Sequence, residues 1–227
     1  MNYFPLSLLG LILLTFTGCS AQERVTFVEQ DGRIDVLIDG RLLTAYRYDN
    51  VLTKPVLYPL ITPAGVKLTR GYPFETVEGE AIYHPHQVGD FFTYDEVNGS
   101  GFWNNTIFPP KIQHIETLAK SEGARGVLKT LSQWVGKDGT ALLKEQRTMT
   151  FIPGNDETDL DFDITLNALV DSVIFDDTKE GMFAVRVAHW LREDQHGQYL
   201  SSEGDVGEKG VWAKRAKWVS LAGEGEA

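Results

Sequence analysis

A period of two in the alternation of apolar and polar residues runs through most of this chain and restricts it to strands. The clearest example is residues 158–169, "TDLDFDITLNAL", where Leu160, Phe162, Ile164 and Leu166 alternate with polar residues. Such alternation places every second side chain on one face, as in a half-buried strand. No segment has a helical period of useful length, so the sequence predicts an all-β fold, a large antiparallel β-sandwich.

Short turn signals separate the expected strands. Asp39-Gly40 lies between two alternating segments, and this dipeptide favours the two-residue turn of a hairpin. Further turns are expected at residues 63–65 and 137–139, and further strands at residues 182–191 and 210–221. These elements fill the chain without a low-complexity linker, which predicts one domain.

The first eighteen residues differ from the rest because they are uncharged and mostly apolar. They end in small residues and are followed at once by Cys19 in "FTGCS", which resembles a bacterial lipobox. We expect residues 1–18 to be a lipoprotein signal peptide, Cys19 to be lipidated, residues 19–24 to be a tether and residues 25–227 to be the domain. The protein would then be exported and lipid-anchored to the bacterial cell envelope, periplasmic or at the cell surface. An ordinary secretory signal with an incidental cysteine is the alternative.

Charge and cysteine content exclude several classes of protein. The formal net charge is -11, which argues against nucleic acid as a partner because phosphate binding needs a basic surface. It also disfavours docking to anionic lipid, so any membrane attachment would be through the lipid anchor. Cys19 is the only cysteine, which rules out a disulfide within the chain and a thiolate metal site.

Residues 80–103, "EAIYHPHQVGDFFTYDEVNGSGFW", contain the densest chemistry. If this segment is extended, His84 and His86 point to the same face, since they are two residues apart. Pro85 cannot donate a hydrogen bond to a neighbouring strand, which favours the rim of a sheet. Two histidines at this spacing suit a metal site or a general acid–base pair, and solvated surface groups are the alternative.

The same segment offers groups that suit a carbohydrate. Asp90 and Asn98 supply polar atoms for hydroxyl groups, and Asn98-Gly99 predicts a turn. Trp103 could stack on the apolar face of a sugar ring, although aromatic residues of this kind are as often part of a core. These three residues are candidates for substrate binding.

Two further sets of polar residues stand out later in the chain. Lys179 and Glu180 lie in a loop that leads into an expected strand with Arg186, so one acid and two cations could meet at the end of a sheet. Glu145 and Arg147 are two residues apart on an expected strand and share a face, where we expect them to pair.

Several blocks of the chain resemble the PmoA-like family, exported bacterial proteins of unknown function that carry the label "methane oxygenase PmoA". The blocks are "KPVLYPLITPAGVKLTRGYPF", "HPHQVGDFFTYDEVNGSGFW", "LLKEQRTMTF", "VIFDDTKEGMFAVRVA" and "GEKGVWAKRAKWV". The resemblance implies a large sandwich of the galactose-mutarotase-like kind and an association with polysaccharide and sugar-oxidation genes. The family continues beyond the last block with a His-rich segment, so the resemblance also implies that the domain is C-terminally truncated or that its site is incomplete.

The resemblance assigns residues to two family motifs. His84 and His86 fall on a His-Pro-His-His block, in which Gln87 stands where a third histidine is usual. Lys179 and Glu180 fall on a Lys-Glu-Gly block, which Arg186 follows.

The most favoured function is an enzyme that acts on a carbohydrate or sugar derivative. His84 or His86 would be the acid–base group with Glu180 as its partner, and Lys179 and Arg186 would orient the substrate. Lyase, epimerase and hydrolase chemistry all fit two titratable groups across a sugar ring. A carboxylate beside an imidazole would raise the pKa of that histidine.

Two alternatives belong to other classes. One is a non-catalytic carbohydrate-binding lipoprotein that uses the same surface. The other is the copper-dependent oxygenase that the family label implies. A divalent metal is compatible with the enzyme as well, and His84 and His86 would be its ligands.

Overall fold

The structure is a computed structural model that describes residues 24–104 and 108–225. The expected signal peptide, Cys19 and the tether up to residue 23 lie outside the described residues. The first half of the fold contains β1 (Val25–Gln30), β2 (Arg33–Ile38), β3 (Arg41–Arg47), β4 (Val56–Leu57), β5 (Asp90–Phe92), β6 (Glu96–Val97) and β7 (Ser100–Gly101). The second half contains β8 (Lys111–Ser121), β9 (Gly126–Val135), β10 (Ala141–Pro153), β11 (Thr158–Ala168), β12 (Phe183–Val185), η1 (His189–Leu191), β13 (Gln198–Ser201), α1 (Glu208–Val211) and β14 (Val219–Ala222).

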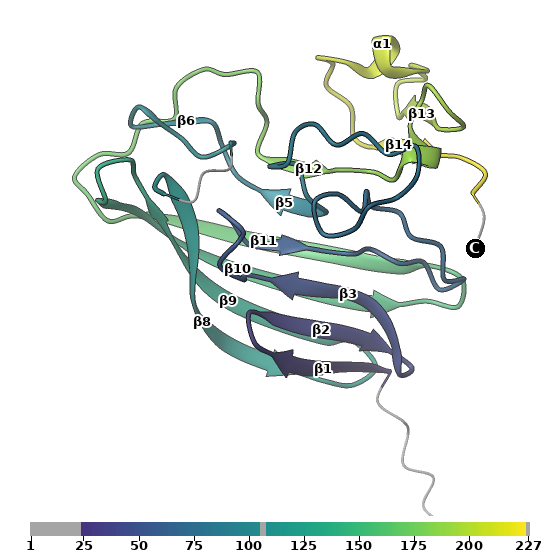
Figure 1. Cartoon of the computed structure of the whole chain (residues 1–227), viewed down its shortest axis with the longest axis horizontal. Helices are drawn as coiled ribbons and strands as arrows, with labels where there is room; N and C mark the ends of the chain where they lie inside the picture. Colours follow the sequence, from purple (N-terminus) through teal and green to yellow (C-terminus); the bar gives the residue numbers. More distant parts are fainter. Residues whose placement is uncertain (1–23, 105–107, 226–227) are drawn as a thin grey trace, which may run out of the picture.

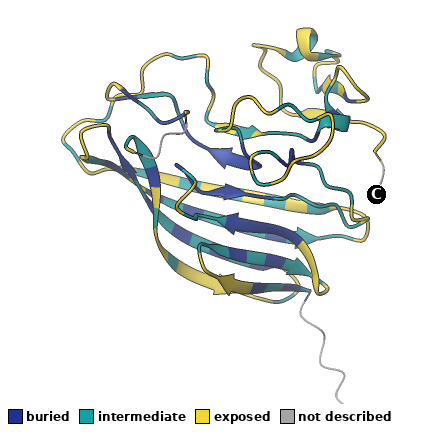
Figure 2. Cartoon of the chain, viewed as in Figure 1, coloured by how far each residue is buried: buried dark blue, intermediate teal, exposed yellow. Residues whose placement is uncertain are grey.

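Two antiparallel sheets form the sandwich that the sequence predicts. One sheet has the strand order β1-β2-β3-β4-β5-β12, and the other has the order β11-β10-β9-β8 (Figure 1). Their facing sides share one core, since Ile34 and Val36 of the first sheet pack in the same cluster as Leu128 and Phe151 of the second. Figure 2 shows the buried residues concentrated on the strands of these two sheets. The all-β prediction is confirmed.

Two hairpins owe their shape to residues in the left-handed region of backbone space. Asp39 and Gly40 have φ values of 49° and 76° between β2 and β3, and Asn98 and Gly99 have values of 49° and 68° between β6 and β7. Positive φ at both central residues is the requirement of the turn that best matches the twist of paired strands. The turns predicted at these positions, at 63–65 and at 137–139 are confirmed.

A buried ion pair lies on the inner face of the second sheet. Arg147 contacts Glu145 at 2.7 Å, and both side chains are almost fully buried. The indole N–H of Trp134 donates to Glu145 at 2.7 Å, so the carboxylate has partners on two strands. The predicted pairing of Glu145 with Arg147 is therefore confirmed, in the interior of the sandwich.

Two predicted strands are much shorter than expected. Within residues 182–191, only β12 is a strand, and η1 follows it because the Leu191 amide donates to the Ala188 carbonyl. Within residues 210–221, only β14 is a strand, because the Val211 amide closes a helical turn on the Gly207 carbonyl. Local hydrogen bonds thus override the apolar pattern in both segments. No helix in the described part of the chain is long and apolar enough to cross a bilayer.

Candidate functional site

The segment His84–Gln87 is a turn and not an extended strand. The Gln87 amide donates to the His84 carbonyl at 3.1 Å, and His84 has a φ of 53°. Pro85 occupies the second position of this turn, where its fixed φ is favourable. The prediction that the histidines share a strand face was wrong, because the turn replaces the period of two. The two rings nevertheless lie together, with centroids 5.4 Å apart.

Arg70 holds this histidine turn, which comprises residues 84–87, in place. Its side chain is buried and donates to the carbonyls of Ala81, Tyr83, His84 and Gln87 at 2.8 to 3.2 Å. A planar guanidinium can serve several acceptors in this way because its N–H groups point in fixed directions. Sequence reasoning missed Arg70, because its partners lie 11 to 17 residues away and leave no local signal.

Arg186 joins the histidine turn from the end of β12. Its amide donates to the Gly89 carbonyl at 2.8 Å, which continues the pairing of β12 with β5. Its side chain donates to the Gln87 side-chain oxygen at 3.0 Å and lies 5.7 Å from the centre of the Tyr83 ring. The structure therefore places the Arg186 side chain against the histidine turn, through Gln87. Gln87 orients this guanidinium.

Lys54 approaches the same region from the loop before β4. Its ammonium group donates to the Trp103 carbonyl at 2.9 Å and lies 5.2 Å from the centre of the Phe91 ring. Burial lowers the pKa of Lys54 to about 7, because a charged ammonium loses its hydration there. Sequence reasoning missed this residue as well, since one lysine beside a proline carries no signal.

The side chains that shift the pKa of His86 are all basic. Burial, and to a smaller extent the neighbouring Lys54, His84, Arg70 and Arg186 side chains, together lower the pKa of His86 to about 4. The prediction that a carboxylate would raise the pKa of a site histidine was wrong for His86. Its imidazole is therefore neutral at pH 7 and can accept a proton. We call the side chains of Lys54, Arg70, His84, His86 and Arg186 the cationic cluster.

Glu80 is an acid that lies near the cationic cluster. The Glu80 carboxylate accepts the Gly71 amide at 2.8 Å and partly offsets the effect of burial on the pKa of Arg70. Its oxygen atom is thereby turned toward the backbone of the Arg70 loop. Glu80 supports the scaffold of the turn, and the guanidinium groups of Arg70 and Arg186 leave an excess of positive charge beside His86.

Glu180 and Lys179 lie elsewhere in the fold. Glu180 precedes β12, whereas Arg186 follows it, so the two residues belong to opposite ends of that strand. The Glu180 amide donates to the Thr178 hydroxyl, and its carboxylate lies 3.7 Å from the exposed ammonium of Lys179. The contacts found in the described part of the chain do not bring Glu180 to the histidines, and its place in their site stays a prediction.

The three candidate substrate-binding residues have structural contacts. Asp90 is buried on β5, where Arg147 is the charged group that acts on its pKa. Trp103 is buried with its ring edge against Phe91, at a centroid distance of 5.3 Å. The Asn98 side chain donates to the Ser172 carbonyl and accepts the Ile174 amide. Only Trp103 reaches the cationic cluster, through the carbonyl that binds Lys54.

The donor set favours an anion over a metal ion. Among the described residues, no group of three or more His, Cys, Asp or Glu side chains could hold a metal. His84 and His86 alone would share the site with the cations of Lys54, Arg70 and Arg186, which repel a metal cation. The same charges attract a carboxylate or another oxyanion.

Comparison with known protein families identifies the chain at the level of a family. Residues 33–227 match the model of a family described as a family of unknown function, DUF6807. The chain belongs to the DUF6807 family. No curated protein and no solved structure matches it. The likeness to galactose-mutarotase-like sandwiches therefore stays a prediction from the sequence, whereas the antiparallel sandwich itself is seen in the structure.

Proposed function

We propose that this DUF6807 protein binds an acidic carbohydrate at the cationic cluster and acts on it by acid–base catalysis, with His86 as the base. One observation carries the proposal. His86 is neutral at pH 7, since its pKa is lowered to about 4, while cationic groups surround it. A proton acceptor among fixed cations is suited to a substrate that carries a negative charge next to an acidic C–H bond.

The arrangement of the cations matches a sugar carboxylate. Arg186 is half-buried, and Gln87 fixes its guanidinium. A fixed guanidinium can bind both oxygen atoms of a carboxylate at once. Tyr83 is exposed beside Arg186 and offers a ring face for the apolar side of a pyranose. A uronic acid provides both features in one residue of a polysaccharide.

The proposed reaction begins with removal of a proton from the carbon next to the carboxylate. The His86 imidazole takes this proton, and the electron pair of the C–H bond moves into the carboxylate, where Arg186 stabilises the added charge. If the C–O bond at the next carbon then breaks, the electron pair forms a carbon–carbon double bond, and the leaving oxygen takes the proton that His86 holds, as in a lyase. If water instead gives a proton to the opposite face of the carbon, the product is an epimer, and His86 passes its proton to the solvent.

Substrate binding itself would strengthen the base. The cations lower the pKa of His86, and a bound carboxylate would oppose their effect and raise the pKa toward its ordinary value. The imidazole would then hold the transferred proton more readily once the substrate is in place. This change requires no carboxylate of the protein beside His86, in contrast to the role first expected for Glu180.

The test is a screen of the purified protein against oligouronides and matched neutral oligosaccharides. We expect oligouronides alone to be converted, with a new ultraviolet absorbance for an unsaturated product or a changed sugar configuration by NMR. His86→Ala should abolish conversion and retain binding, whereas Arg186→Gln should weaken binding. His196→Ala, in an exposed turn, is the matched control.

Two outcomes would contradict parts of the proposal. Binding of oligouronides without conversion by the unaltered protein would leave the alternative, a carbohydrate-binding lipoprotein. Equal behaviour of neutral and acidic sugars would contradict the assignment of the cationic cluster.

The proposal also includes membership of the PmoA-like family, export and lipid attachment at Cys19. The quoted sequence blocks and the "FTGCS" motif support these points. Attachment outside the cytoplasm would place the cationic cluster where exogenous polysaccharides occur. The positive charge of the cluster favours this acid–base function over the copper chemistry of the family label.

A further inference from the structure

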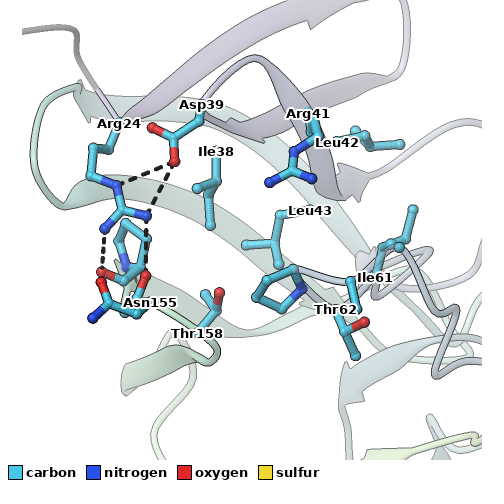
Figure 3. A pocket seen from close by; sticks show the side chains of 15 residues that line it. Arg24, Ile38, Asp39, Arg41, Leu42, Leu43, Ile61, Thr62, Asn155 and Thr158 are labelled. Atoms are coloured by element: carbon cyan, nitrogen blue, oxygen red, sulfur yellow. Dashed lines mark hydrogen bonds and ion pairs between the residues drawn. The ribbon is translucent and has the colours of Figure 1, made fainter.

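A cavity lies where three turns meet at one end of the sandwich, away from the cationic cluster. It has a volume of about 180 Å³ and lies between the β2–β3 turn, the turn at residues 62–65 and the β10–β11 turn. Its apolar side chains include Ile38, Leu43 and Ile61. Figure 3 shows these side chains with Arg24 and Arg41 on either side of Ile38. We call this space the turn cavity.

Arg24 makes the wall of the turn cavity rigid. Its guanidinium donates to the Asp39 carboxylate at 3.1 Å and to the carbonyls of Pro153 and Gly154 at 3.0 and 3.1 Å (Figure 3). These bonds tie the start of β1 to the β2–β3 turn and to the β10–β11 turn. The cavity is therefore held open by bonds within the protein, as in a preformed ligand site.

The acidic residue nearest to Arg41 in the sequence, Asp39, already forms an ion pair with another residue. Arg33 pairs with Asp35, and Arg47 pairs with Asp49, in each case an acid two residues away. Asp39 is two residues from Arg41, but Arg24 binds it. In the described part of the chain, no hydrogen bond or ion pair of the Arg41 side chain is found, although the protein has a net charge of -11.

Acids occupy the opposite side of the same region. Asp156 and Glu157 of the β10–β11 turn line an adjoining hollow, which shares Leu43, Ile61 and Thr158 with the turn cavity. A ligand that spans both spaces therefore meets a cation at one end and hydrogen-bond acceptors at the other. Between these ends lies an apolar surface.

We propose that the turn cavity is a second binding site, which takes a sugar acid of about one ring. Its carboxylate would bind Arg41, its C–H face would pack on Ile38, Leu43 and Ile61, and its hydroxyls would donate toward Asp156 and Glu157. The turn cavity of about 180 Å³ and the adjoining hollow of about 210 Å³ have room for a ligand of this size. The inference does not depend on the function proposed for the cationic cluster, because no residue is shared between the two sites.

The experiment is a titration of the full chain with glucuronate, followed by NMR of isotope-labelled Ile and Leu methyl groups. We expect glucuronate to shift the methyl signals of Ile38, Leu43 and Ile61, and glucose to shift them much less. Arg41→Gln should weaken this binding about tenfold or more, because it removes a charge-assisted pair of hydrogen bonds. Arg125→Gln is the matched control, since Arg125 is an exposed arginine of the β8–β9 turn.

His86→Ala separates the two sites. The methyl shifts in the turn cavity should persist in this variant, even if binding at the cationic cluster is lost. Loss of the cavity shifts in His86→Ala would overturn the inference, as would the absence of shifts in the unaltered protein. An equal loss of affinity in Arg41→Gln and Arg125→Gln would also overturn it, since general charge would then explain the binding.

Discussion

Replacing Asp90 by asparagine tests the polar interior of the sandwich. Asp90 is buried on β5, and one of its carboxylate oxygens has no hydrogen-bond partner among the described residues. Burial raises the pKa of Asp90 from 3.8 to about 7, and Arg147 only partly opposes this effect. Asparagine has nearly the same shape but no charge at any pH, so Asp90→Asn isolates the cost of the buried charge.

The expected effect follows from the difference between the folded and unfolded pKa. From about pH 4 to pH 7, folded Asp90 keeps a proton that the unfolded chain has lost, so the free energy of unfolding falls as the pH rises. The fall ends above about pH 7, where both states are ionised. At about 1.4 kcal/mol per pH unit, the loss between pH 5 and pH 8 is about 3 kcal/mol. The free energy of unfolding of Asp90→Asn should not fall in this way, because asparagine carries no charge at any pH.

The assay is urea unfolding followed by tryptophan fluorescence, which reports on the fully buried Trp134. We expect the stability of Asp90→Asn relative to the unaltered protein to increase by about 3 kcal/mol between pH 5 and pH 8. Asp161→Asn, on the exposed side of β11, should show no such change. If the pH profiles of Asp90→Asn and the unaltered protein run parallel, the argument for a protonated buried Asp90 is refuted.

Three further changes test other parts of the molecule. Arg70→Lys should destabilise the protein by about 2 to 4 kcal/mol, because one ammonium group cannot donate to four carbonyls. Faster hydrogen exchange of the Gln87 amide would show that the histidine turn has loosened, and unchanged exchange would contradict the role of Arg70. Asn98→Ala should lower the free energy of unfolding by about 1 to 2 kcal/mol, since it removes two hydrogen bonds and a residue suited to a positive φ; thermal unfolding measures this loss, and an unchanged melting temperature would count against it. Cys19→Ala should release the protein from the membrane fraction, and identical partitioning of both forms would show that the lipobox interpretation is wrong.

Local patterns in the sequence were sufficient for the sandwich and its turns. Alternation predicts which side chains of a strand share a face, because the period is fixed by the extended backbone. Asp39-Gly40 and Asn98-Gly99 predict their hairpins, because few residues tolerate positive φ. Glu145 and Arg147 were expected to pair for the same geometric reason. Where local hydrogen bonds close a helical turn, as in α1, the pattern failed.

The tertiary structure decided the composition of the candidate site. His84 and His86 meet because Arg70 binds carbonyls on both sides of their turn, and Arg186 arrives through the pairing of β12 with β5. Lys54 reaches the same place from the loop before β4 and bonds to a residue 49 positions away. The charge around His86, and hence the direction of its pKa shift, depends on these distant contacts. A single sequence fixes the residue types and the local period, but pairings between distant segments arise only when the core closes.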